Sequence, residues 1–377
     1  MARHANLREP RRGESGEATE DAARTRSASR AARRIPDEGA SKREKRKRWD
    51  RTPGRSLDVA REKWTCWRYR VLWSWHNREA RRLHRASPAP LGSAQQRVLA
   101  DLRRCGIARA SFEEICGDGA PFAALRDEAL VWSDSETVAH AERAYREAVR
   151  SKPRFKGFLA SLHDKGATIA WEDPWLQAGI HRSLLALAEH YFGLLPRLHH
   201  ANLWKSFPLA HPGPLVGPQA WHRDPADLSV LKAFLYFSDV TDDAGPLEYV
   251  PYSRPGERFG HLWRPAIPLR GAHPPALDFE REIPIGERVR CCHPAGTVVL
   301  VDTAGFHRGG RAVGRARLVG TWAYSSQASL WPRKFRVRGL GDRPLSLAVH
   351  YALLAGRAPQ PASEPDRAPH AERGGRA

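Results

Sequence analysis

The spacing of apolar residues changes sharply within the first ninety positions of the chain. Up to about Arg55 almost no large apolar residue occurs, and such a segment cannot bury enough surface to offset the entropy lost on folding. We therefore predict that residues 1–55 form a disordered, basic leader. From 56 to 87 aromatic residues recur at helical spacing between arginines, which predicts a basic amphipathic helix with an apolar stripe made of Trp64, Trp67, Val71 and Trp75.

Beyond Pro88 the pattern is that of a globular domain, which we expect to extend over 88–340. Its first half is mainly helical by periodicity, with one short strand expected at 107–110. A capping box at Ser111-Phe-Glu-Glu114 predicts the start of a helix directly after that strand. The other expected helical segments are Ser93–Arg103, Glu136–Val149 and the stretch from Pro174 to Phe192.

Beyond Pro196 the periodicity changes to that of short strands separated by Pro and Gly. The expected strands are Leu203–Phe207, Leu228–Val240, Leu247–Val250, Arg288–Cys292, Thr297–Asp302 and Leu318–Ser325. Several short strands at this density predict a sandwich or a barrel. The fold class is therefore mainly β with flanking helices, and the Pro-, Ala- and Arg-rich stretch 356–377 is expected to be a loose tail.

Charge adds a second interpretation of the N-terminal segment. The formal net charge is +20, and residues 1–90 hold 25 Lys and Arg against 12 Asp and Glu. A basic helix that carries tryptophans can bind an anionic membrane surface or a nucleic acid, or it can dock its stripe on the body of the protein. We favour docking, because apolar stripes at helical spacing are usually core faces. Contact of residues 1–85 with nucleic acid or an anionic surface stays an alternative.

Composition excludes several classes of protein. With 41% apolar residues the chain can build a core. No run approaches the ~18 apolar residues that cross a bilayer, and the N-terminus lacks the apolar segment of a secretory signal, so we expect a cytoplasmic protein. Five irregularly spaced cysteines fit neither a disulfide framework nor paired zinc-binding CxxC motifs.

The residues best suited to metal binding lie in the β-rich half. His222 and Asp224 precede an apolar run, and residues two apart on a strand point to the same face, so both can converge on one ion. The strand Thr297–Asp302 leads to His307, a second imidazole. Two histidines and one carboxylate leave three coordination positions open, which suits non-haem iron(II). Arg317 starts the next strand, where its guanidinium can bind a carboxylate bidentately.

Other histidines compete for these positions. The triplet at 140–142 lies in an expected helix, where residues two apart point away from each other, and the triplet at 370–372 lies in the expected loose tail. His293 is the main rival for the second imidazole, but it precedes Pro294 ahead of the strand and is less suitable than His307. The predicted metal ligands are His222, Asp224 and His307.

Four sequence blocks occur in an order that carries a resemblance. They are Trp221-His-Arg-Asp224, the block Asp239 to Arg254 (DVTDDAGPLEYVPYSR), Gly296-Thr-Val-Val-Leu-Val-Asp302, and His307. Together they resemble the phytanoyl-CoA dioxygenase family of iron(II)- and 2-oxoglutarate-dependent oxygenases, most clearly from about Ala201 to Ser326. The resemblance implies a double-stranded β-helix, a jelly roll of cupin type, preceded by N-terminal helices.

The resemblance also implies a role for each candidate residue. The implied ligands of Fe(II) are His222, Asp224 and His307. Arg317 would hold the C5 carboxylate of 2-oxoglutarate, with Arg315 as the alternative because it would share the same strand face, and Lys205 is a weaker candidate for another contact. The implied reaction uses O2 and 2-oxoglutarate to hydroxylate an unactivated C–H bond of a small organic substrate, releasing succinate and CO2. Related halogenases lack the carboxylate that Asp224 provides, so hydroxylation is favoured.

Several alternatives remain open at this level. Four aromatic residues near the ligands either line the pocket or, taken singly, belong to the core: Trp221, Tyr236, Phe237 and Phe306. The chain could also be a cupin-like binding protein with a catalytically silent metal site, or a polyanion- or membrane-associated protein that acts through residues 1–85. The substrate itself is not identified by the resemblance, although the basic excess favours an anionic one.

Overall fold

Helices dominate the first half of the part of the chain that the structure describes. The structure is a computed structural model, and it describes residues 64, 67–210, 213–263 and 273–354. The predicted leader 1–55, the beginning of the expected amphipathic helix and the expected tail 356–377 lie outside these residues. Residues 67–76 are helical. The helices that follow are α4 (Arg78–Ala86), α5 (Ser93–Cys105), α6 (Phe112–Cys116), α7 (Ala120–Ser133), α8 (Glu136–Ser151), α9 (Pro174–Gly179) and α10 (Arg182–Phe192).

Local capping decides where two of these helices begin. Ser111 accepts a hydrogen bond from the Glu114 N–H while the Glu114 carboxylate accepts one from the Ser111 N–H, which confirms the predicted capping box. The single helical stretch expected from Pro174 to Phe192 is two helices. His181 adopts an extended ψ of 134° and its side chain accepts a hydrogen bond from the Ser183 N–H, so a new helix starts there.

Six antiparallel strands form the main sheet, in the order β1-β8-β5-β10-β4-β2. A second sheet has the order β7-β6-β9, and β3 and β11 form a separate parallel pair. The strands are β1 (Ile107–Ser111), β2 (Leu159–Ser161), β3 (Ala167–Ala170), β4 (Arg197–Ser206), β5 (Leu231–Tyr236), β6 (Leu247–Tyr249), β7 (Val289–Arg290), β8 (Thr297–Asp302), β9 (His307–Gly309), β10 (Arg317–Ser325) and β11 (Phe335–Arg338). The remaining helices are α11 (Ala276–Glu282) and α12 (Leu347–Leu354).

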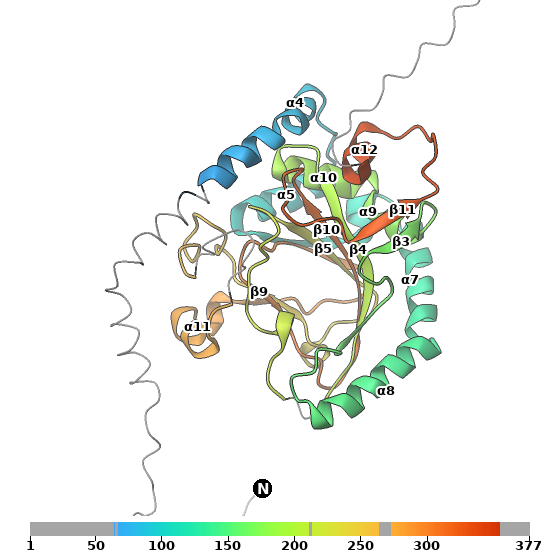
Figure 1. The fold of residues 1–377 in the computed structure, drawn as a ribbon, viewed down its shortest axis with the longest axis vertical. Helices are drawn as coiled ribbons and strands as arrows, with labels where there is room; N and C mark the ends of the chain where they lie inside the picture. Colours follow the sequence, from blue (N-terminus) through green and yellow to red (C-terminus); the bar gives the residue numbers. More distant parts are fainter. Residues whose placement is uncertain (1–63, 65–66, 211–212, 264–272, 355–377) are drawn as a thin grey trace, which may run out of the picture. The chain divides into compact units, whose positions relative to one another are not determined.

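The two faces of the main sheet have different partners. On one face, Leu235 of β5 and Trp322 of β10 belong to an apolar core that includes residues of α5, α9 and α10, and Figure 1 shows these helices beside the strands. On the other face, Phe234 and Tyr236 pack against residues of the second sheet, among them Tyr249. Two antiparallel sheets thus face each other as a double-stranded β-helix with flanking helices, which confirms the expected fold class.

The strand β4 is longer than the sequence predicted. It begins at Arg197, six residues before the expected start at Leu203. This added part contains His199, His200 and Asn202, polar residues that interrupt the apolar pattern although all three are buried. Asn202 pairs with Thr321 and His200 with Ala323 of β10, while His199 lies at a register shift. Pairing with β10, rather than local hydrophobicity, therefore holds this segment extended.

The basic helix packs on the body of the protein through a face other than the predicted stripe. Tyr69 Oη and Trp73 Nε1 donate hydrogen bonds to Asp227 Oδ1, at 3.3 and 2.7 Å. One turn further, Asn77 Nδ2 donates to Ser326 Oγ at 3.0 Å. The helix therefore docks as predicted, but the prediction of which helix face docks was wrong. The face that docks carries hydrogen-bond donors, because its partners on the body, Asp227 and Ser326, are polar. The stripe itself is exposed in Trp64, Trp67, Val71 and Trp75.

Trp73→Ala should weaken this docking more than Trp75→Ala does. The first change removes a hydrogen bond and packed indole surface, so we expect a loss of about 2–3 kcal/mol in the free energy of unfolding. Trp75 is 63% exposed, and its replacement should cost less than about 0.5 kcal/mol. Urea unfolding measures both, and the rate of tryptic cleavage among the helix arginines gives an independent readout. Equal losses in the two variants would show that this docking face is wrong.

Among the residues that the structure describes, no helix is both long enough and apolar enough to cross a membrane.

Candidate metal centre

Two imidazoles and one carboxylate meet at one end of the space between the sheets. Each of His222, Asp224 and His307 offers a ligand atom, and these atoms all lie within 4.8 Å of one another. His222 Nε2 is 3.9 Å from Asp224 Oδ1, and His307 Nε2 is 3.8 Å from Asp224 Oδ2. Because metal–ligand bonds are about 2 Å long, this spacing suits three ligands of a single ion.

Backbone pairing brings these three residues together. The His222 N–H donates to the His307 carbonyl and the His307 N–H donates to the His222 carbonyl, both at 3.0 Å, in an antiparallel bridge. The Asp224 N–H donates to the Thr303 carbonyl at 2.9 Å. His222 and Asp224 are two residues apart on extended backbone and so share a face. The segment 303–307, about 80 residues further along the chain, therefore supplies the second imidazole and also the backbone hydrogen bonds that hold His222 and Asp224 in place.

In each histidine, the hydrogen-bond partner of Nδ1 determines whether Nε2 is free to bind a metal. His222 Nδ1 lies 2.9 Å from the Ala220 carbonyl, and His307 Nδ1 lies 3.1 Å from the Gly305 carbonyl. A carbonyl only accepts, so each Nδ1 carries the proton. Each Nε2 is then left with a lone pair on the side of Asp224. This is the tautomer and the carbonyl support that metal-binding histidines have.

The protonation states of the three side chains also suit a metal. Burial lowers the pKa of both His222 and His307, so both imidazoles are neutral near pH 7. Burial acts to raise the pKa of Asp224, but the nearby Lys232 ammonium, which is also hydrogen-bonded to the carboxylate, holds that pKa well below its ordinary value. Neutral imidazoles and an ionised carboxylate are the forms that bind a divalent cation.

Sequence analysis missed Lys232 at this centre. Its Nζ lies 2.6 Å from Asp224 Oδ2, and it reaches that oxygen from β5. The signal was present in the sequence, because Lys232 alternates with Phe234 and Tyr236 on the inner face of an otherwise apolar strand. His273 was missed as well, and its ring stacks on that of His222 with a centroid separation of 5.7 Å.

A cavity of about 580 Å³ opens onto the three ligand side chains. Arg317 lines it from β10, with only 9% of the residue exposed. The Arg317 guanidinium donates to the Gly245 carbonyl, its Nε has no hydrogen-bond partner, and it forms no ion pair with any carboxylate among the described residues. A buried cation in this state is costly unless an anion reaches it. An anionic group that entered the cavity could offset this cost.

Two other predicted cationic residues do not reach this cavity. Arg315 lies in a bend before β10 starts, so the shared strand face expected for it does not exist. Its Nε is 3.7 Å from Asp243 Oδ2 and its side chain is 68% exposed. Lys205 points to the other face of β4, where Nζ donates to the Ser133 carbonyl at 2.9 Å.

The remaining histidine and aromatic candidates lie elsewhere. His293 pairs with Val240 through the backbone, away from the three ligands. His140 is exposed on α8, and His370 lies outside the described residues. Of the four aromatic candidates, Tyr236 lines the cavity. The other three pack in apolar cores: Trp221, Phe237 and Phe306.

Comparison with known proteins finds one matching family. A family model described as phytanoyl-CoA dioxygenase (PhyH) matches residues 112–317, which is more than half of the chain and includes the three ligand residues and Arg317. No curated protein matches the chain.

Solved structures of low sequence identity also match. The epimerase SnoN in complex with Fe3+, alpha ketoglutarate and nogalamycin RO is 19% identical, with 67% of this chain and 94% of that chain covered and a TM-score of 0.44. EctD from S. alaskensis with 2-oxoglutarate and 5-hydroxyectoine is 16% identical, with coverages of 64% and 78% and a TM-score of 0.41. HygX from Streptomyces hygroscopicus with nickel, 2-oxoglutarate and hygromycin B is 14% identical, with coverages of 63% and 89% and a TM-score of 0.39.

Proposed function

The chain belongs to the phytanoyl-CoA dioxygenase family, and from this premise we propose that it is an iron(II)- and 2-oxoglutarate-dependent oxygenase that hydroxylates a C–H bond of a small organic substrate. The convergence of His222, Asp224 and His307 in the forms that bind a divalent cation is the observation that carries the proposal. Two nitrogens and one carboxylate oxygen suit iron(II) and leave positions for a co-substrate and O2. The retained carboxylate of Asp224 supports hydroxylation over halogenation.

Arg317 is the residue that we propose to hold 2-oxoglutarate. It lines the same cavity as the three ligand residues, and its buried guanidinium lacks an anionic partner within the described chain. A guanidinium can bind a carboxylate through two parallel hydrogen bonds. Its grip on the distal carboxylate would direct the other end of the co-substrate towards the ligand side chains.

The apolar residues that line the cavity would exclude water and orient the substrate. Phe234, Tyr236 and Val319 lie between Arg317 and the ligand residues on neighbouring strands. When bound, iron(II) and 2-oxoglutarate supply the oxidising chemistry that acts on the substrate with O2, releasing succinate and CO2. The wall residues keep water away from that chemistry and orient the substrate, which is the protein's share in cofactor-based reactions. Lys232 fixes Asp224 by an ion pair and leaves its other oxygen directed at His222.

Anaerobic titration of the full chain with iron(II) and 2-oxoglutarate tests the proposal. We expect a visible absorption band from charge transfer between the metal and the chelating keto acid, followed on admission of O2 by release of succinate. A band without succinate release, with or without added substrates, would favour a binding protein with a silent metal site. Absence of the band in protein that has been loaded with iron would contradict the oxygenase assignment.

Arg317→Gln should raise the concentration of 2-oxoglutarate needed to develop this band by about 10–100-fold, because a charge-assisted bidentate contact is lost. Iron affinity, measured in the absence of 2-oxoglutarate, should stay the same. Arg315→Gln is the matched control and should change the 2-oxoglutarate requirement by less than about twofold. Arg317→Lys should recover part of the affinity, which separates loss of the contact from misfolding. An equal effect of the two Gln variants would refute the role of Arg317.

A further inference from the structure

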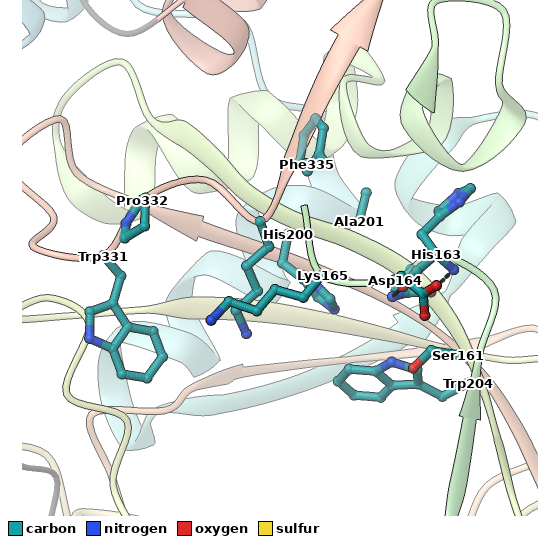
Figure 2. Close-up of a pocket in the computed structure, with 12 residues that line it drawn as sticks. Ser161, His163, Asp164, Lys165, His200, Ala201, Trp204, Trp331, Pro332 and Phe335 are labelled. Carbon is teal, nitrogen blue, oxygen red and sulfur yellow. Dashed lines mark hydrogen bonds between the residues drawn. The ribbon is translucent and has the colours of Figure 1, made fainter. Parts of the chain in front are cut away.

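A second cavity, of about 520 Å³, adjoins the one that contains the metal-binding residues. Trp204, Trp331 and Lys334 line both cavities, so these three side chains form the boundary between them. Figure 2 shows the two indole rings on either side of the second cavity, with His200 and Lys165 between them. A molecule that occupies the second cavity therefore lies beside the space in which the proposed chemistry takes place.

The buried imidazole of His200 lines this second cavity, and that of His199 precedes it in β4. The pairing of β10 with β4 shifts register between Ala323 and Tyr324, opposite His199. His200 is 8% exposed and lines the cavity, and its Nε2 has no hydrogen-bond partner among the described residues. His199 is 2% exposed and both of its ring nitrogens lack partners there. Buried polar groups are nearly always hydrogen-bonded, so the imidazole of His200 leaves hydrogen-bonding capacity unused beside this cavity.

The charges around the second cavity favour an anion. Lys334 forms no ion pair with a carboxylate in the described part of the chain, whereas Lys232 is already paired with Asp224. Lys165 lies exposed at the same cavity, and Asp164 is the single carboxylate among its lining residues. Burial, followed by the positive charge of Lys232, lowers the pKa of Lys334, and the opposite charge of a bound anion would act against this shift.

We propose that this second cavity is a substrate subsite for an aromatic molecule that carries one anionic group, a carboxylate or a phosphate. The anionic group pairs with Lys334, and the ring lies against Trp204 and Trp331. Indoles provide large apolar contact surfaces, and a partly desolvated ammonium binds an anion strongly. The inference rests on the proposed function, because it places the substrate beside the proposed iron site.

Calorimetric titration of the metal-free full chain with 2-naphthoate, 1-naphthyl phosphate and the neutral 2-naphthamide tests the subsite. We expect at least one of the two anions to bind about tenfold or more tightly than the amide. Lys334→Gln should remove most of that difference and leave amide binding unchanged, whereas Trp331→Leu should weaken all three ligands. Lys152→Gln, which replaces an exposed lysine at the end of α8, is the control and should bind as the unmodified chain does.

The same protein samples separate failure of the subsite from failure of the proposed function. If neither anion binds more tightly than the amide, or if Lys334→Gln weakens 2-oxoglutarate in the charge-transfer titration instead of the naphthyl anions, the subsite is overturned and the oxygenase assignment is untouched. If an anion binds in a Lys334-dependent way but iron and 2-oxoglutarate give no band, the subsite is supported and the oxygenase assignment fails.

Discussion

The His307→Ala variant is expected to lose the charge-transfer band and all succinate release. Its Nε2 is one of the three candidate ligand atoms, which lie within 4.8 Å of one another, and without it only two of them remain. The variant should also retain much less iron after desalting, which metal analysis measures directly. His222→Ala and Asp224→Ala should behave in the same way, because each removes one ligand of the same set.

Two histidine variants serve as controls for this experiment. His293 was the rival for the second imidazole, and it lies against Arg109 with 3.4 Å between His293 Nδ1 and Arg109 Nη1. His140 is exposed on α8. His293→Ala and His140→Ala should leave the band and the bound iron unchanged. A normal band in His307→Ala, or its loss in His293→Ala, would end the assignment of the metal ligands.

Arg223→Leu is expected to cost about 3–5 kcal/mol of the free energy of unfolding, although Arg223 is not one of the three proposed metal ligands. The residue is 2% exposed, and its guanidinium lies 3.8 Å from the ring centroid of Phe306. It donates hydrogen bonds to four backbone carbonyls, those of Ser253, Ala304, Phe259 and Leu262. Leucine would leave the carbonyls of Ser253, Ala304 and Leu262 without this donor, whereas the Phe259 carbonyl still accepts from the Leu262 N–H. Each buried acceptor left unpaired costs free energy.

The loss in Arg223→Leu should extend to the metal centre. Ala304 is next to Thr303, whose carbonyl fixes the Asp224 backbone, and Phe306 is next to His307. Urea unfolding measures the stability, and iron retention measures the effect on the site. Arg258→Leu is a matched control from the same region, since that side chain is 63% exposed and pairs with Glu287 at the surface. A loss below about 1 kcal/mol in Arg223→Leu would show that these carbonyls find other partners.

Local signals in the sequence were sufficient for several elements whose cause is local, although the cap at His181 that separates α9 from α10 was missed. The capping box at Ser111 and Glu114 predicts the start of α6, and the run Thr297–Asp302 is the strand β8 with the same bounds. Two-residue spacing places His222 and Asp224 on one face, as the structure has them. The polar half of β4 was missed because its extended form comes from pairing with β10.

Only the tertiary structure shows which of two similar candidate residues occupies a given site. Arg315 and Arg317 are the same residue type two positions apart, and only the start of β10 at Arg317 places one in the cavity and the other at the surface. Trp73 and Trp75 differ in the same way, because Trp73 hydrogen-bonds to Asp227 while Trp75 is exposed. Lys232 becomes a partner of Asp224 only because β5 runs beside the bridge between His222 and His307.

By itself, then, the amino-acid sequence determined the chemical inventory of this protein: which side chains can ligate a metal, which segments are helices or strands, and which faces of them are apolar. The tertiary structure decided which of those side chains meet, which cations remain without a partner, and which face of the basic helix is covered. The physical reason is that side-chain periodicity is set within a few residues, whereas contact, burial and charge pairing depend on residues that are distant in the chain and close only after folding.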